Sequence, residues 1–106
     1  MTNAEVLEII GGMTPVRDYL RGIEEGSEAD WDAHRAILAA IGSARAAGVY
    51  PAMAVAEPEQ YAQYVLLLCR LWTDAEDQRA DAIGRQAAGL CLQLRYDKRN
   101  VSDEEE

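Results

Sequence analysis

Phenylalanine is absent from this chain of 106 residues, and lysine and histidine each occur once. Without Phe, a hydrophobic core has to be built from Leu, Ile, Val, Ala and Met, with help from two Trp and five Tyr. A chain of this length can still bury a core large enough to fold without metal ions or disulfides. We therefore expect a single helical domain over residues 1–99.

Positive charge is scarce. Ten Lys and Arg residues stand against nineteen Asp and Glu residues, which gives a formal net charge of −9. Nucleic-acid binding depends on clustered Lys and Arg side chains that contact phosphates. The one local basic cluster, Arg95, Lys98 and Arg99, suits the C-terminal end of a helix. We expect no direct contact with DNA or RNA.

Long apolar runs are missing as well. No stretch approaches the roughly 20 apolar residues that span a bilayer, and the first residues, Met1 to Glu5, carry acid where a secretory signal carries Lys or Arg. We expect a cytoplasmic protein with no membrane partner.

The two cysteines, Cys69 and Cys91, suit a reducing compartment as small buried side chains. On two antiparallel helices joined near Thr73 they would lie roughly 21 Å apart, whereas a disulfide needs Cα atoms within about 7 Å. The spacing therefore predicts no disulfide.

The segment from Tyr61 to Trp72 is apolar around most of a helical circumference, with only Gln63 and Arg70 as a polar edge within it. A helix of this kind needs neighbours on several sides. We predict a central helix near 58–72 with Pro58 in its first turn.

Helical spacing and capping signals predict the remaining helices, and with them an all-α, compact bundle of about five helices. Thr2 and Glu5 have the spacing of a capping box, Thr14-Pro15 suits a helix start, and Gly26 suits a helix end. Trp31, Leu38 and Ile41 fall on one stripe. The other predicted helices cover about 3–10, 15–26, 27 or 30 to 47, and 74–96.

Gly84 and Gly89 lie inside the predicted last helix, where each costs about 1 kcal/mol relative to Ala. Close approach of a facing ridge of small residues on the helix ending near Ala47 would compensate for this cost. Such packing predicts that a large side chain at Gly84 is strongly destabilising. Residues 100–106 read as an acidic, disordered tail.

Two segments are candidate surfaces for a partner. The first is the group of five acids between residues 24 and 32, at the start of the predicted helix that ends near 47. Carboxylates at such a position are stabilised by the helix dipole and stay solvated, and they also suit contact with a basic surface of a partner. Residues 49–56 contain no charge, so they either fold into the core through Tyr50, Met53 and Val55 or form an exposed apolar epitope. The candidate partner-binding residues are Glu24, Glu25, Glu28, Asp30, Asp32, Tyr50 and Met53.

Catalytic and metal-binding patterns are weak. His34 is the one histidine, and with Asp30 four residues earlier it supplies two ligands, fewer than a zinc site needs. No serine has triad context, and the glycines form no phosphate loop. We therefore expect no cofactor, no metal and no enzymatic activity. The enzyme or ligand-binding alternative is a pocket formed by His34, Tyr61, Tyr64 and nearby carboxylates.

The preferred hypothesis is a non-enzymatic acidic helical protein-interaction module that binds another protein, such as one with a basic, nucleic-acid-binding surface. Small acidic inhibitors of phages and mobile elements, anti-CRISPR proteins among them, have this general character, and the likeness is one of composition. A further alternative is a phage structural or assembly-chaperone protein that self-associates.

Overall fold

The computed structural model describes residues 1–20, 22–73 and 79–102, with the backbone alone at position 73. Regular structure in these residues is all helical, which confirms the predicted fold class. The described residues form six helices and no strand, and five of the helices have seven or more residues. The helices are α1 Asn3–Ile9, α2 Met13–Tyr19, α3 Glu28–Ala46, α4 Pro51–Ala56, α5 Pro58–Thr73 and α6 Ala80–Arg95.

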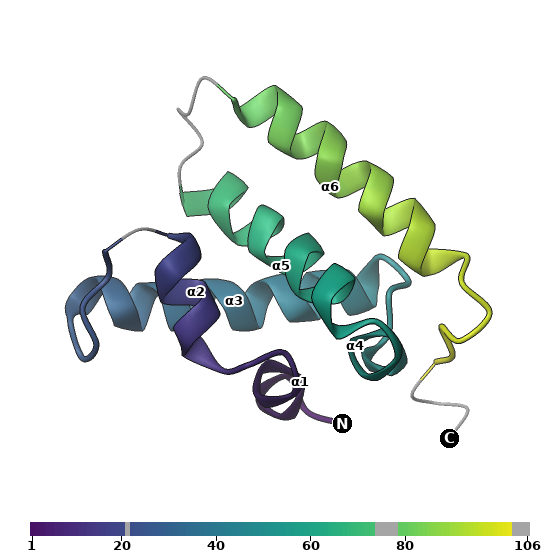
Figure 1. Cartoon of the computed structure of the whole chain (residues 1–106), viewed down its shortest axis with the longest axis horizontal. Coiled ribbons are helices and arrows are strands. Elements are labelled where there is room, and N and C mark those ends of the chain that lie inside the picture. Colours follow the sequence, from purple (N-terminus) through teal and green to yellow (C-terminus); the bar gives the residue numbers. More distant parts are fainter. Residues whose placement is uncertain (21, 74–78, 103–106) are drawn as a thin grey trace.

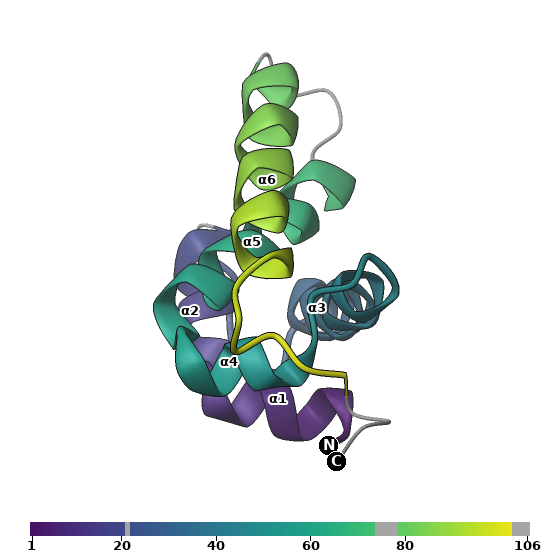
Figure 2. The ribbon, with the colours of Figure 1, turned by 90° about the vertical axis from the view of Figure 1, so that its right-hand side faces the viewer.

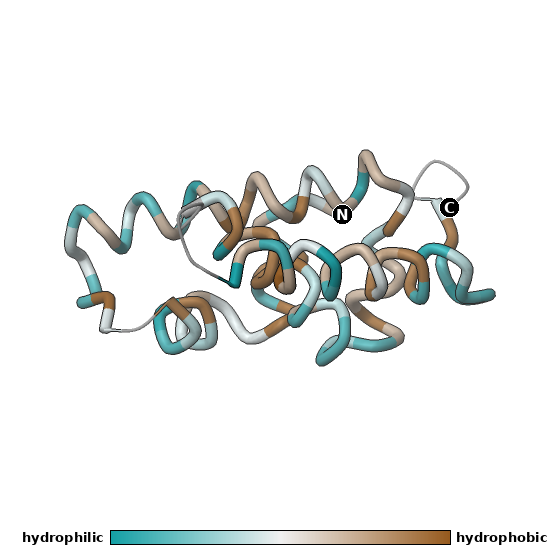
Figure 3. Tube along the Cα trace, turned by 90° about the horizontal axis from the view of Figure 1, so that it is seen from above, coloured by the Kyte–Doolittle hydropathy of each residue, from teal (hydrophilic) through white to brown (hydrophobic). Residues whose placement is uncertain are grey.

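The bundle is organised around α5. This helix packs against α6 on one side and against α3 and α4 on the other, while α1 and α2 cover α3. α6 lies beside α5 at the opposite edge of the molecule from α1 (Figures 1 and 2). The central position predicted for residues 58–72 is confirmed. Hydrophobic and hydrophilic stretches follow one another along the helices (Figure 3).

The capping box at α1 forms as predicted. The Glu5 backbone N–H donates to Thr2 Oγ1, and the Thr2 backbone N–H donates to Glu5 Oε1, each over 3.2 Å. Gly11 and Gly12 then adopt φ angles of 109° and 69°, a region that favours glycine, and the first helix ends there.

The second predicted helix is shorter than the sequence indicated. α2 begins at Met13 after the N-cap residue Gly12, so Thr14 lies inside the helix and does not cap it. The helix ends at Tyr19, well before Gly26. Gly26 instead belongs to the turn that precedes α3, where its φ is 80°.

The inward face of α3 differs from the predicted stripe. The buried positions follow the spacing i, i+4, i+7, i+8 and i+11, and they are Ala33, Ile37, Ala40, Ile41 and Ala44. Trp31 is 61% exposed, so its predicted place in the core stripe is wrong. This stripe packs against α5 and α1, and three of its five side chains are small Ala side chains.

The uncharged segment 49–56 folds inward. Val49, Met53 and Ala54 are fully buried, and residues 51–56 form the short helix α4. The core placement of Met53 is confirmed, whereas Val55 is 60% exposed and was placed wrongly. An exposed epitope across this whole segment is excluded.

One prediction about α6 is wrong. The principal packing partner of α6 is α5, and a Cβ atom added at Gly84 or Gly89 would meet no neighbouring atom within 4 Å. Close approach to α3 therefore does not explain these glycines, and it gives no reason for a large side chain at Gly84 to destabilise the chain. Thr73 and Glu76 also have the spacing of a capping box, which predicts a helix start, and this prediction falls on side chains outside those that the structure describes.

Asn100, the first residue of the predicted tail, is anchored. Its Nδ2 donates to the carbonyl oxygens of Gly48 and Arg95 at 2.7 and 2.9 Å, and its Oδ1 accepts from the Tyr50 N–H at 2.9 Å. One amide thus joins the ends of α3 and α6 to the start of α4. The domain extends at least to residue 100, and residues 103–106 lie outside the described chain.

Candidate functional site

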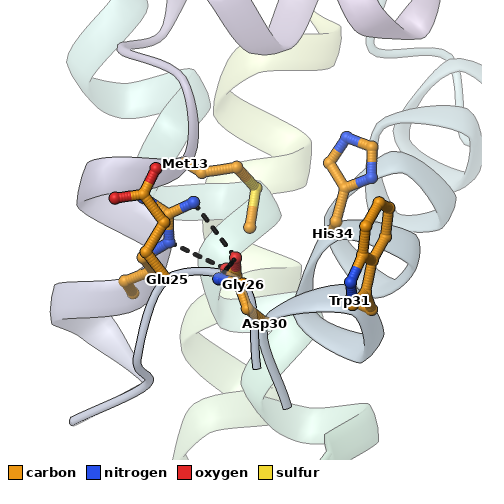
Figure 4. A pocket seen from close by; sticks show the side chains of 7 residues that line it. Met13, Glu25, Gly26, Asp30, Trp31 and His34 are labelled. Carbon is orange, nitrogen blue, oxygen red and sulfur yellow. Dashed lines mark hydrogen bonds and ion pairs between the residues drawn. The ribbon is translucent and has the colours of Figure 1, made fainter. Parts of the chain in front are cut away.

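A pocket of about 350 Å³ lies between α2 and the start of α3. Met13 and Glu25 lie on one side of it, Trp31 and His34 lie on the other, and Asp30 lies between them (Figure 4). The residues that line it are Met13, Arg17, Glu25, Gly26, Asp30, Trp31 and His34. Local helical spacing explains part of this set, because positions 30, 31 and 34 point to adjoining sides of α3.

The base of the pocket is an ion pair. Arg17 Nε and Nη2 donate to Asp30 Oδ1 and Oδ2 at 2.8 and 3.2 Å, and the Gly26 backbone N–H donates to Oδ2 at 2.9 Å. Hydrogen bonds from Arg17 and then from Gly26 hold the pKa of Asp30 below its usual range, against the opposing effect of burial. The same pairing raises the pKa of Arg17.

The turn before α3 is fixed by the same group of residues. The Ser27 hydroxyl donates to the Glu24 carbonyl oxygen at 2.7 Å and accepts from the Asp30 N–H at 3.1 Å. Ser27 is therefore the cap of α3, so the helix begins at the earlier of the two starts, 27 or 30, that the sequence indicated. Because these bonds close the turn from both ends, Glu25 is held beside the pocket, where its charge interacts with that of Arg17.

Exposed carboxylates surround this turn. Glu24 and Glu25 are exposed in the turn itself, and Glu28 and Asp32 are exposed on the first two turns of α3. We call these four residues, together with Trp31, the acidic α3 surface. Arg35, one turn after Trp31, is an exposed cation next to it. Four exposed carboxylates against one guanidinium leave the surface negative.

Three of the predicted partner-binding residues are not part of the acidic α3 surface. Asp30 lines the pocket but is largely buried, and its carboxylate is already paired with Arg17, so it is not the solvated carboxylate that the sequence suggested. Met53 is fully buried and cannot serve as a surface anchor. Tyr50 is half-buried at the start of α4, at the far end of α3 from the pocket, and does not join the acidic α3 surface.

The alternative site predicted around His34 is present only in part. His34 does line a pocket, but Tyr61 and Tyr64 are buried on α5, 0% and 4% exposed, and do not line it. Burial and a hydrogen bond with Cys91 raise the pKa of Tyr64 well above its ordinary value. The Asp30 carboxylate accepts hydrogen bonds from Arg17 and Gly26. Asp30 and His34 therefore do not form an isolated pair in which the carboxylate orients the imidazole as a base.

Among the described residues, no group of three or more His, Cys, Asp or Glu side chains is placed to hold a metal ion. Within the same residues, no helix combines the length and the apolar character needed to cross a bilayer. Cys69 is buried and Cys91 half-buried, and the two are not joined in a disulfide.

Sequence reasoning missed Trp31, Met13 and Arg17 as residues of the site. A signal for Trp31 existed, because Ala33, Ile37 and Ala44 define a continuous inward stripe that leaves position 31 outside it. Arg17 and Asp30 are thirteen residues apart and lie on different helices, and no local spacing predicts such a pair.

No protein-family model, curated protein or solved structure matches this chain.

Proposed function

We propose that this chain is a protein-interaction module and that the acidic α3 surface binds a basic surface of another protein. The observation that carries the proposal is an indole 61% exposed at the rim of a formed pocket, with exposed carboxylates on the turn beside it. Large exposed aromatic side chains are enriched among the residues that dominate binding energy in protein interfaces.

Charge supports the choice of partner. The formal net charge of −9 repels acidic partners, and the four carboxylates of the acidic α3 surface attract a cluster of Lys and Arg. Nucleic-acid-binding proteins carry positive patches of this kind. A partner that binds DNA or RNA through such a patch would lose access to nucleic acid when the patch is covered. The chain would then act as an inhibitor of that partner, as the preferred hypothesis from the sequence suggests.

The fold also supports a binding role through rigidity. The turn that carries Glu24 and Glu25 is closed by Ser27, Gly26 and Asp30 before any partner arrives. A surface that is ordered in the free protein loses little conformational entropy when it binds. Binding by this surface therefore needs no rearrangement of the helices.

The test compares two triple variants of equal charge. The first replaces Glu25, Glu28 and Asp32 with Lys, and the control replaces Glu8, Glu59 and Asp81, which are exposed on α1, α5 and α6. Glu59 and Asp81 occupy first turns of helices, as Glu28 does in the first variant, so the control loses at least as many favourable helix-dipole contacts.

Each variant is used to capture proteins from the cells in which the chain naturally occurs, and captured proteins are identified by mass spectrometry. We expect the partner of the wild-type chain to bind the control normally and the first variant at least about tenfold more weakly at low salt. Its remaining binding should depend less on salt. Equal binding of both variants to that partner at low and high salt would refute the proposal.

A small-ligand module is a second candidate function, because the pocket reaches His34 and has the volume of a small binding site. Trp31, Met13 and His34 would then contact the ligand. A thermal-shift screen of small cations and amino acids against the wild-type chain and Trp31→Ala tests this function. A compound that stabilises the wild-type chain alone would support it, and a screen without any such compound would count against it.

A further inference from the structure

We propose that the pocket between Met13, Glu25, Trp31 and His34 receives one arginine side chain of the partner protein. This inference rests on the proposed function, since it names the chemical group that the acidic α3 surface recognises. A volume of about 350 Å³ lies at the small end of ligand-binding pockets and leaves room for an arginine side chain.

The charges of the lining residues favour a cation. Arg17 and Asp30 neutralise each other at the base of the pocket, in a pair closed by bonds of 2.8 and 3.2 Å. Glu25 is the remaining carboxylate of the lining, it is exposed, and no hydrogen bond to it is found among the described residues. Among Arg17, Asp30 and Glu25, two carboxylates stand against one guanidinium, and this excess of negative charge favours an entering cation over an anion.

The apolar walls favour the long stem and flat end of arginine. The indole of Trp31 is the aromatic ring on which cations bind most strongly, and a guanidinium stacks on it through its planar face. Met13 on the opposite side offers a flexible thioether that adapts to the methylene stem (Figure 4). Glu25 beside it supplies a carboxylate that a guanidinium can contact with two parallel hydrogen bonds.

Lysine fits this arrangement less well. Its ammonium is a compact, strongly hydrated charge without a planar face, so it loses more on leaving water and gains less from the indole. The proposal therefore includes a preference for arginine over lysine at this one position, although both cations would be attracted by the surrounding carboxylates.

The experiment uses three peptides that differ at one side chain: acetyl-Gly-Arg-Gly-amide, its lysine counterpart, and its citrulline counterpart, which is nearly isosteric with arginine but uncharged. Each is titrated into the isotopically labelled full chain, and the side-chain signals of Met13, Trp31 and Trp72 are followed by NMR. Trp72 is an internal control, because it is 46% exposed on α5 and does not line the pocket.

The arginine peptide should shift the Trp31 Nε1–H and Met13 methyl signals in a saturable way and leave Trp72 nearly unchanged. The lysine peptide should bind several-fold more weakly, and the citrulline peptide should give no saturable shift. Trp31→Ala should abolish the Met13 response, and Glu25→Gln should weaken arginine binding by about threefold or more. Glu59→Gln should leave it unchanged.

Equal shifts of Trp31 and Trp72, or equal binding of the arginine and citrulline peptides, would overturn the inference. Because Trp31 is largely in solvent, Trp31→Ala should fold normally, and circular dichroism checks this directly. Trp31→Leu, which keeps an apolar wall but removes the aromatic face, provides a second variant.

Failure of this inference is distinguishable from failure of the proposed function. If the captured partner binds Trp31→Ala normally but loses affinity for the charge-reversed triple variant, the arginine pocket is wrong and the acidic interface stands. If the arginine peptide occupies the pocket but charge reversal leaves partner binding unchanged, the proposed function is wrong and the arginine pocket stands.

Discussion

α5 and α6 are adjacent helices of equal length, 16 residues each, in very different surroundings. α5 packs against three other helices, and its fully or nearly buried side chains are Tyr61, Tyr64, Val65, Leu67 and Cys69. α6 packs chiefly on α5 and buries Ile83, Ala87 and Leu94. The number of packed faces, more than helical propensity, sets how much each position contributes to stability.

The largest expected difference concerns two leucines. Leu67 on α5 is 4% exposed and Leu92 on α6 is 55% exposed. Leu67→Ala should lower the free energy of unfolding by about 2–5 kcal/mol, because it removes buried methyl groups and leaves a cavity. Leu92→Ala should change it by no more than about 0.5 kcal/mol. Urea denaturation of both variants measures the contrast, and similar losses would show that α6 has a covered outer face.

The two cysteines should differ in reactivity. Burial raises the pKa of the Cys69 thiol to about 11, whereas Cys91 on α6 is half-buried. Since the thiolate is the reactive form, alkylation of Cys91 at pH 8 should be faster by more than about tenfold. Mass spectrometry of singly alkylated protein gives both rates. Cys69→Ala and Cys91→Ala assign the signals, and preferential labelling of Cys69 would contradict the assigned burial.

The glycines allow a smaller contrast between α6 and the core helix α3. Gly89→Ala on α6 should stabilise the chain by about 1 kcal/mol, because a methyl group there meets open space and Ala favours the helix. At Gly42 on α3 the added Cβ would lie 3.3 Å from Asn3 Nδ2, so that gain should be smaller or reversed. Thermal unfolding of Gly89→Ala and Gly42→Ala measures this difference in stability. A loss of stability in Gly89→Ala would contradict the open space around that position.

The smallest expected effect lies just beyond the end of α6. Hydrogen bonds from Arg99 lower the pKa of Asp97 to about 2, whereas an unfolded Asp titrates near 3.9. A lowered folded pKa contributes stability that is complete above about pH 4 and is lost as the pH falls towards 2. Arg99 is half-exposed, so the contribution is weak.

Asp97→Asn should therefore flatten the fall of the unfolding temperature between pH 4 and pH 2. Asp32→Asn, at an exposed position beyond the first turn of α3, is the control and should follow the wild-type chain. Identical profiles for Asp97→Asn and the wild-type chain would exclude this contribution.

The sequence by itself determined the helical class, the positions of most helices and the central place of α5. Those features follow from terms that act within one or two turns: the spacing of Val65 and Leu67, the capping box of Thr2 and Glu5, and the breaks at Gly11 and Gly48. The run of acids before α3 was equally readable. Its division into exposed carboxylates and the buried Asp30 was not.

Tertiary structure decided which groups meet. Arg17 reaches Asp30 across thirteen residues, and Asn100 reaches Tyr50 across fifty, through bonds that leave no periodic trace in the sequence. Trp31 faces water because the alanine and isoleucine stripe of α3 takes the inward side, and the pocket forms where α2, the turn before α3 and the start of α3 meet. Local patterns specify elements, whereas a binding surface depends on where the packing of several elements leaves a gap and an unburied side chain.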